Sequence, residues 1–128
     1  MKPYAKLYVS SENEKGIFGN GKYQLLKAVQ QHRSISKAAN SLQRSYRKAW
    51  GDIKKAESAL GQQLVKKVRG GRFGGQTELT EYCEKVLKAW EIYRENVNTA
   101  MNTSFNKNLK CLYEQPKKMK KNISTGKA

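Results

Sequence analysis

The residues best suited to chemistry in this sequence are the lysines and arginines between positions 44 and 72. Nine cations stand there against two acids, Asp52 and Glu57, which leaves a local excess of seven positive charges. A merely solvated surface mixes the two signs more evenly, so this excess indicates contact with a polyanion. The nine cations are Arg44, Arg47, Lys48, Lys54, Lys55, Lys66, Lys67, Arg69 and Arg72.

The whole chain carries the same sign of charge. Its 128 residues include 26 lysines and arginines and 10 acids, for a formal net charge of +16. Such a charge indicates a polyanionic partner, namely DNA, RNA, an anionic membrane or an acidic protein. The hydrophobic share of 38% is enough for one domain with a modest core.

Residue patterns for catalysis or metal binding are not visible in the sequence. It contains no dinucleotide-binding, phosphate-loop or zinc-protease motif, and His32 is its one histidine. The two cysteines, Cys83 and Cys111, lie too far apart in the sequence for a metal-binding pair, and we expect them to be reduced and packed. We therefore expect neither an enzyme nor a bound metal or cofactor.

Signals for a membrane or for secretion are also missing from the sequence. No stretch approaches the roughly 20 apolar residues of a membrane-spanning helix, and the N-terminus lacks the pattern of a secretion signal. The sequence therefore predicts a cytoplasmic, nucleoid-associated protein with no membrane partner.

The apolar spacing predicts three consecutive helices between residues 21 and 60. Ser34 or Ser36 is expected to cap the second helix and Ser45 the third, since a serine hydroxyl accepts a hydrogen bond from a free N–H group at a helix start. Gly61 is expected to end the third helix. The positions expected to face the core are Leu25, Leu26 and Val29 in the first helix, Ala38, Ala39 and Leu42 in the second, and Ala49, Ile53, Ala56 and Leu60 in the third.

Strands are expected on both sides of these helices. Alternation in residues 4–10 predicts a half-buried strand with Ala5, Leu7 and Val9 on one face. After the third helix, the segments "QQLVKKVR" and "QTELT" predict a β-hairpin. Its glycine-flanked tip, "GGRFGG", is expected to expose Arg72.

A long helix is expected to follow the hairpin, with Thr80 as its cap. Its apolar residues recur in steps of four and three, which favours a partner helix from a second copy of the chain. The alternative is that this stripe packs on its own domain. The stripe consists of Leu79, Cys83, Val86, Trp90, Tyr93, Val97 and Ala100.

This order of elements predicts a mainly α fold with a small β-hairpin: a winged helix-turn-helix with a long C-terminal dimerisation helix at about residues 80–106. Residues 1–106 would form this DNA-binding domain. Residues 107–128 are rich in lysine and poor in apolar side chains, so we expect them to form a basic, disordered tail.

In a fold of this kind the third helix lies in the major groove of DNA, with its N-terminal residues near the base edges. At about 100° per residue, Arg47, Gly51 and Lys54 point away from the expected core. Gly51 either lets the helix backbone come close to DNA or is merely tolerated inside the helix, and Tyr46 lies in the first turn. Trp50 lies beside the buried stripe and is expected to pack in the core.

The sequence also resembles a known family over about residues 17–90. The segments "FGNGKYQLLKA", "SISKAANSL", "SYRKAW" and "RGGRFGG" are similar, in order and spacing, to the N-terminal DNA-binding domain of the ModE-type molybdate-responsive regulators, which are winged-helix relatives of the LysR-type regulators. The resemblance implies a homodimer held largely by the first and last helices. It further implies that helix 45–60 reads the major groove and that wing 69–76 contacts the minor groove or the backbone.

The resemblance also implies which residues contact DNA. Carried over to this sequence, they are Ser45, Tyr46, Arg47 and Lys48 in the helix, with Arg72 in the wing. With the neighbouring cations added, the expected DNA-binding set is Arg44, Ser45, Tyr46, Arg47, Lys48, Lys54, Arg69 and Arg72.

Three features depart from the family pattern. Gln43–Arg44 stands where glycine is usual, so a non-glycine residue would take a left-handed conformation. Cys83 also stands where glycine is usual. The oxyanion-binding domains of the full-length regulators have no counterpart in this sequence, so binding of molybdate or another oxyanion is not expected.

The leading hypothesis is therefore a homodimeric, sequence-specific transcription regulator of bacterial type that binds double-stranded DNA. The alternative is a nonspecific or architectural DNA-binding protein, whose affinity would come from the net charge and the lysine tail. A third class, a module that binds RNA or an acidic protein, agrees with the charge but gains no support from the helix-turn-helix pattern.

Overall fold

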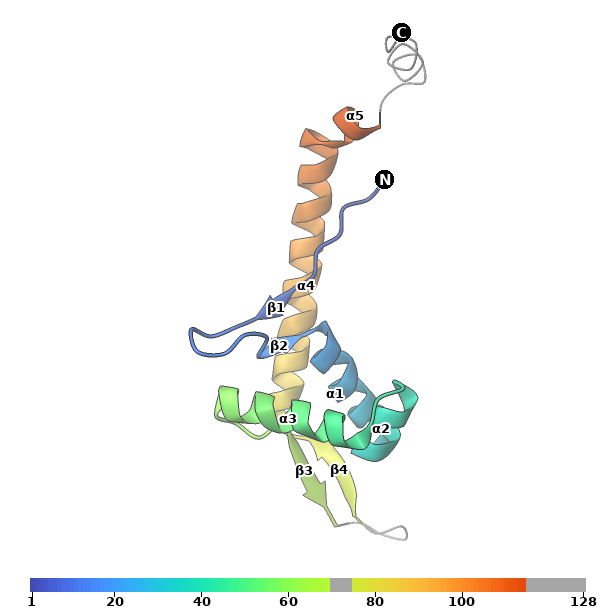
Figure 1. Ribbon diagram of the computed structural model, residues 1–128, viewed down its shortest axis with the longest axis vertical. Coiled ribbons are helices and arrows are strands. Elements are labelled where there is room, and N and C mark those ends of the chain that lie inside the picture. The colour runs from blue at the N-terminus through green and yellow to red at the C-terminus, as the bar shows by residue number, and fades with distance from the viewer. Residues whose placement is uncertain (70–74, 115–128) are drawn as a thin grey trace. The chain divides into compact units, whose positions relative to one another are not determined.

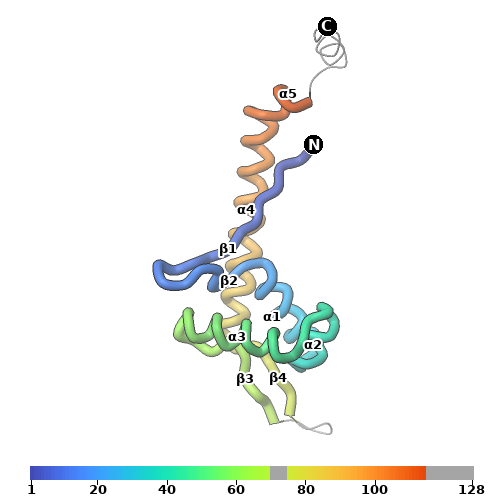
Figure 2. Tube along the Cα trace, in the orientation of Figure 1, coloured from blue at the N-terminus to red at the C-terminus, as the bar shows by residue number. Residues whose placement is uncertain are grey.

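The computed structural model describes residues 1–69 and 75–114. Figure 1 shows the helices and strands in chain order, and Figure 2 traces the same backbone. Two compact units are present: Lys6–Ile92 forms one, and Met1–Ala5 forms the other with the described part of the chain from Tyr93 onward. Within the described residues, no helix combines the length and the apolar character that crossing a membrane requires.

The unit Lys6–Ile92 contains the three predicted helices, α1 (Asn20–His32), α2 (Ile35–Ser41) and α3 (Tyr46–Leu60). Serine side chains cap the second and the third, as the sequence predicts. Ser34 accepts a hydrogen bond from the N–H of Lys37 at 3.1 Å. Ser45 accepts one from the N–H of Lys48, also at 3.1 Å. These bonds satisfy N–H groups that have no partner within the helix.

The hydrophobic core of this unit draws on all three helices and on the hairpin that follows them. Phe18 and Trp90 belong to it, and their rings meet edge to face with 5.3 Å between the centroids. Leu42 and Leu60 are half-buried at its margin. The predicted core residues that are buried are Leu25, Leu26, Val29, Ala38, Ala39, Ala49, Ile53 and Ala56.

The turn between α2 and α3 sets the direction in which α3 begins. The N–H of Arg44 bonds to the carbonyl of Ala39 at 2.9 Å, and the N–H of Gln43 bonds to that of Asn40 at 3.0 Å, which is the Schellman pattern. Gln43 has a φ of 57°, a left-handed conformation that usually selects glycine. The expectation of a non-glycine residue in this conformation is therefore confirmed. Gly61, with a φ of 69°, ends α3 as predicted.

The predicted antiparallel hairpin is present as β3 (Val65–Val68) and β4 (Gln76–Leu79). Backbone hydrogen bonds fix its base. The N–H of Thr80 bonds to the carbonyl of Leu64, and the N–H of Thr77 bonds to the carbonyl of Arg33, both at 3.0 Å. The hairpin is therefore tied to the end of α1 as well as to itself. Most of the expected tip, residues 70–74, lies outside the described residues.

Helix α4 (Glu81–Asn108) begins as predicted, because the hydroxyl of Thr80 accepts a hydrogen bond from the N–H of Cys83 at 3.1 Å. The first part of its apolar stripe packs on its own unit, since Leu79, Cys83 and Trp90 are buried. Burial raises the pKa of the Cys83 thiol to about 12. This thiol therefore stays protonated and behaves as a small apolar side chain.

The second unit contains the rest of α4 and α5 (Lys110–Tyr113). Phe105 is buried there and stacks on Tyr113, with 6.5 Å between the ring centroids. Residues 107–114, which the sequence places in the basic tail, thus include helical structure. Helix α4 continues past residue 106, where the sequence places the start of the tail. Residues 115–128 lie outside the described part of the chain.

The strand expected over residues 4–10 is much shorter than predicted. Two short antiparallel strands form instead, β1 (Tyr8–Val9) and β2 (Phe18–Gly19). Gly16 turns the chain with a φ of 72° just before β2, and α1 begins directly after β2, so the partner strand has no room to extend. Leu7 packs against the core, whereas Ala5 and Val9 are exposed, so the expected inner face is wrong for those two residues.

Candidate nucleic-acid interface

The first turn of α3 exposes the predicted contact residues. Ser45 uses its hydroxyl oxygen to cap the helix, which leaves its hydroxyl hydrogen to donate to a partner. Tyr46 is 51% exposed, and Arg47 and Lys48 are exposed beside it. This turn is also the positive end of the helix dipole, which favours an anion nearby.

The side of α3 that faces away from the core contains Arg47, Gly51 and Lys54, because successive residues are rotated by about 100° around a helix. A methyl group added at Gly51 would meet no atom of the chain within 4 Å, so packing inside the protein does not require glycine there. Glycine in a helix interior costs about 1 kcal/mol relative to alanine. The bare backbone at this position is therefore free for the close approach of a partner.

Several cations near this side are paired with acids. Lys48 lies 3.9 Å from Asp52, and Lys55 lies 3.7 Å from Glu14. Other cations have no such partner: among the residues that the structure describes, no acid lies within 4.0 Å of the exposed side chains of Arg47, Lys66, Lys67 and Arg69. The cations without an acidic partner among the described residues therefore lie on α3, on β3 and directly after β3.

The three remaining predicted arginines differ in their surroundings. The guanidinium of Arg44 donates to the carbonyl of Gly21 at 3.2 Å, so it helps to hold the turn against α1. Arg69 is exposed at the end of β3 and is the last described residue before residues 70–74. Arg72 lies outside the described residues.

Glu57 ties α3 to the start of β3. Its carboxylate accepts hydrogen bonds from the N–H of Leu64 at 2.7 Å, from the N–H of Val65 at 3.3 Å and from the ammonium group of Lys54 at 3.1 Å. Burial alone would raise the pKa of Glu57, but the hydrogen bonds outweigh it and hold the pKa below its usual value. The carboxylate is therefore charged at neutral pH. From the sequence, Glu57 counts only as an opposing charge, because its partners come close only in the fold.

Trp50 is 46% exposed, so the expectation that it packs in the core is wrong. It follows the buried Ala49 by one residue, and a rotation of about 100° moves its ring past the edge of the buried stripe. The Nζ atom of Lys54 lies over the indole ring, 5.6 Å from the centroid, in a cation–π contact. Both side chains line an open hollow of about 230 Å³ between α3 and the hairpin.

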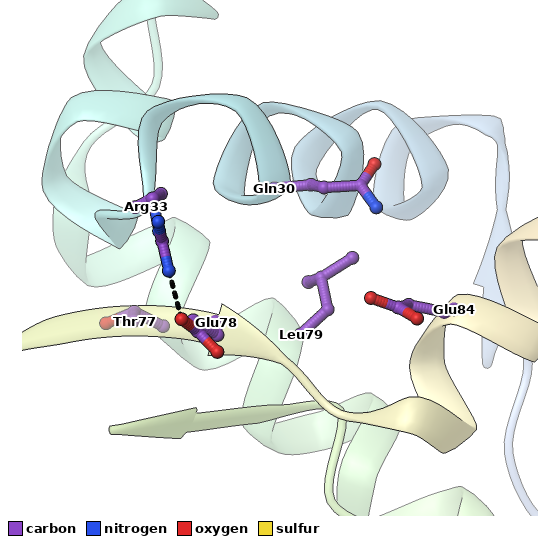
Figure 3. A pocket seen from close by; sticks show the side chains of 6 residues that line it. All are labelled: Gln30, Arg33, Thr77, Glu78, Leu79 and Glu84. Atoms are coloured by element: carbon purple, nitrogen blue, oxygen red, sulfur yellow. Dashed lines mark hydrogen bonds and ion pairs between the residues drawn. The ribbon is translucent and has the colours of Figure 1, made fainter. Parts of the chain in front are cut away.

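A second hollow, of about 270 Å³, lies beside α1 and β4 (Figure 3). Arg33 forms an ion pair with Glu78 at its edge, and Glu84 adds another carboxylate. Two acids and one guanidinium that is already engaged do not favour an oxyanion. Across residues 1–69 and 75–114, no group of three or more histidine, cysteine, aspartate or glutamate side chains is arranged to hold a metal ion.

Comparison with known proteins identifies a matching family. The sequence pattern of the bacterial regulatory helix-turn-helix proteins of the LysR family matches residues 21–84, half of the chain. The transcriptional regulator ModE of Haemophilus influenzae is 35% identical over 68 residues, which cover 53% of this chain and 27% of that protein. The molybdenum transport protein ModE of Azotobacter vinelandii is 32% identical over 77 residues, which cover 60% of this chain and 28% of that protein. The chain thus spans about a quarter of the length of these relatives.

Solved structures share the fold. The chain in the BenM_DBD/benA site 1 DNA complex aligns with a TM-score of 0.52 and 21% identity, and the match covers 70% of this chain and 96% of that chain. At this identity the similarity concerns the fold. It agrees with a winged helix-turn-helix built from α1–α3 and the β3–β4 hairpin.

Proposed function

Since the chain belongs to the LysR family of bacterial regulatory helix-turn-helix proteins, we propose that it is a transcription regulator that binds specific sequences of double-stranded DNA. The observation that carries this proposal is the group of exposed cations on α3 and β3, Arg47 among them, that no described acid neutralises. Arg47 lies next to the capped start of α3, the part of a helix-turn-helix that reaches base edges. A fold neighbour solved as a DNA complex adds support.

In this proposal α3 lies in the major groove. Tyr46, Arg47 and Lys48 meet base edges or phosphates from the first turn, and the hydroxyl hydrogen of Ser45 donates to a phosphate. The bare backbone at Gly51 lets the helix lie deep in the groove. Arginine suits base reading because its two parallel N–H donors match the O6 and N7 acceptors of guanine. Arg47 is therefore the residue that we assign to sequence recognition.

The hairpin acts as the wing. Arg69, together with Arg72 outside the described residues, would contact phosphates or the minor groove, where a narrow groove attracts arginine. Lys54 is close enough to the hairpin to join these contacts, since Glu57 holds it there. Arg44 stabilises the turn and adds positive charge beside the same DNA segment.

We also propose that the protein acts as a homodimer through α4. Exposed apolar side chains occur on this helix in both units: Ile92 is 54% exposed in one, and Tyr93 is 45% exposed in the other. Burying them against a second copy removes apolar area from water, which favours association. Two copies would then present two α3 helices to half-sites roughly 34 Å apart. Sedimentation is expected to show a dimer, and Tyr93→Glu is expected to weaken it. A wild-type protein that is monomeric at micromolar concentration would contradict the proposed homodimer.

Selection from a random duplex library at several salt concentrations tests specific binding. We expect one sequence to be enriched and its affinity to fall steeply with salt, because lysine and arginine displace counterions from phosphates. Arg47→Glu is expected to abolish this preference while the fold and the oligomeric state persist. The matched control is Lys6→Glu, which makes the same change of charge at an exposed position outside α3 and the hairpin. Equal binding by the two variants would refute the assignment of Arg47.

The alternative is a nonspecific or architectural DNA-binding protein. It is suggested by the net charge of +16 and by the five lysines among residues 115–128. Deleting residues 115–128 separates the two functions. A truncated chain that still enriches the same sequence supports specific regulation, whereas loss of nearly all affinity supports the alternative.

A further inference from the structure

The hollow between α3 and the hairpin places a tryptophan among lysines. Its lining includes Trp50 and Lys54 from α3, and Lys66 and Lys67 from β3. Thr77 of β4, which is itself buried, also lines it. Lys54 lies on the same helix as Trp50, whereas Lys66 and Lys67 come from β3, so the hairpin has to pack beside α3 before they form one site.

The indole of Trp50 contacts Lys54, which is itself bonded to Glu57. The Nζ atom of Lys54 lies 5.6 Å from the ring centroid and 3.1 Å from the Oε1 atom of Glu57. Glu57 in turn accepts the N–H groups of Leu64 and Val65 at the start of β3. Tryptophan is usually much more buried than 46% exposure implies. A large ring that is kept open to solvent beside cations therefore indicates a surface prepared for a partner.

We propose that this hollow binds one stretch of the DNA sugar–phosphate backbone, with the face of Trp50 packed against a deoxyribose and with Lys66 and Lys67 at the adjacent phosphates. This inference rests on the proposed function. Lysine carries a compact point charge that suits a phosphate, whereas paired recognition of a guanine edge suits arginine. With three lysines and no arginine in its lining, the hollow suits the backbone better than base edges. Trp50 therefore adds affinity that does not depend on the base sequence.

Fluorescence quenching tests the contact in the unmodified protein. The chain has two tryptophans, and Trp90 is 5% exposed against 46% for Trp50. A neutral quencher such as acrylamide therefore reaches mainly Trp50 in the free protein. Saturating duplex DNA is expected to remove most of the quenchable fraction. A quenchable fraction that stays the same when DNA is bound would overturn the proposal.

Substitution measures what the contact contributes. Trp50→Ala is expected to weaken binding about tenfold, by the same factor on the enriched sequence and on a random duplex. Its salt dependence should stay unchanged because the indole carries no charge, whereas Lys66→Ala should lower the slope by about one. The matched control is Tyr8→Ala, which removes another exposed ring with a lysine, Lys15, 5.9 Å from its centroid. This control should bind DNA like the wild type.

DNA binding by the wild type tests the proposed function, whereas DNA binding by the Trp50 variants tests the contact in this hollow. Trp50→Phe keeps a flat ring and should retain most of the affinity, and urea unfolding of each variant checks that the fold persists. A loss of binding that is confined to the enriched sequence would assign Trp50 to base reading and overturn the backbone contact. If the wild type binds no DNA, the proposed function fails. If the wild type binds and Trp50→Ala binds equally well, the inference about this hollow alone fails.

Discussion

Replacing Glu57 with glutamine tests how α3 and the hairpin are held together. In the wild type, the carboxylate accepts two backbone N–H groups, from Leu64 and Val65, and one bond from Lys54. Glutamine keeps one oxygen for the N–H groups but turns an NH2 group toward the ammonium of Lys54. Hydrogen bonds to charged groups contribute about 1.5–3 kcal/mol and neutral ones about 0.5–1.5 kcal/mol, so each N–H bond loses about 1 kcal/mol. The two N–H bonds together lose about 2 kcal/mol, and the half-exposed ion pair with Lys54 adds up to about 1 kcal/mol. We therefore expect Glu57→Gln to lower the free energy of unfolding by about 2–3 kcal/mol at pH 7.

This difference should depend on pH in one direction. The pKa of Glu57 is lower in the folded protein than the usual value of about 4.3. The charged carboxylate therefore stabilises the fold fully above about pH 4.3, and this stabilisation is lost as the pH falls through the lower folded pKa. Glutamine does not titrate. Wild type and variant should consequently converge in stability as the solution is acidified.

Urea unfolding at a series of pH values between neutral and acid measures both effects. The control is Glu12→Gln, which removes the same charge from an exposed side chain and should change stability by less than about 0.5 kcal/mol. A variant that loses as much stability at low pH as at pH 7 would show that the charge of Glu57 is irrelevant. If Glu57→Gln loses no more unfolding free energy than the control, the hydrogen bonds of Glu57 contribute little to stability.

Two further substitutions concern single backbone positions. Gln43→Gly should raise the free energy of unfolding by up to about 1 kcal/mol, because glycine takes the φ of 57° without strain, and Gln43→Ala should give no such gain in the same unfolding assay. Gly51→Ala should also stabilise the fold by up to about 1 kcal/mol, yet it should weaken binding to the enriched DNA in a titration, because its methyl group would meet the groove. Unchanged affinity in Gly51→Ala would argue against a close approach of α3.

The parts of the fold that depend on neighbours in the sequence could be predicted. Ser34 and Ser45 cap helices because a cap needs only the next three residues, and the buried stripe of α3 follows from helical spacing alone. The left-handed Gln43 could be expected from the resemblance, because the ModE-type family usually has glycine in this turn.

The parts that depend on distant segments could not be predicted in this way. The alternation around Val9 predicts a long strand, but its partner β2 is only two residues long. Trp50 lies at the edge of the apolar stripe of α3. Whether such a ring is buried depends on how far the neighbouring elements extend over that edge, which the sequence does not specify. The role of Glu57 depends on where β3 begins relative to α3, which spacing does not specify. The cations of the candidate site are visible in the sequence, whereas the acids that neutralise some of them are known only from the fold.

The way in which Glu57 holds the hairpin has a consequence for protein engineering. On the β3 side it bonds only to main-chain N–H groups, and every residue except proline provides such a group. The exposed side chains of β3, Lys66 and Lys67, can therefore be exchanged without loss of this attachment, whereas Val65 packs against the core. Wings with different charges could be transplanted onto the same helix-turn-helix, provided that the acid at position 57 is kept. Glu57 and the backbone hydrogen bonds at the base of the hairpin would then make the wing an interchangeable module, in which DNA affinity could be altered separately from the sequence that we propose α3 to read.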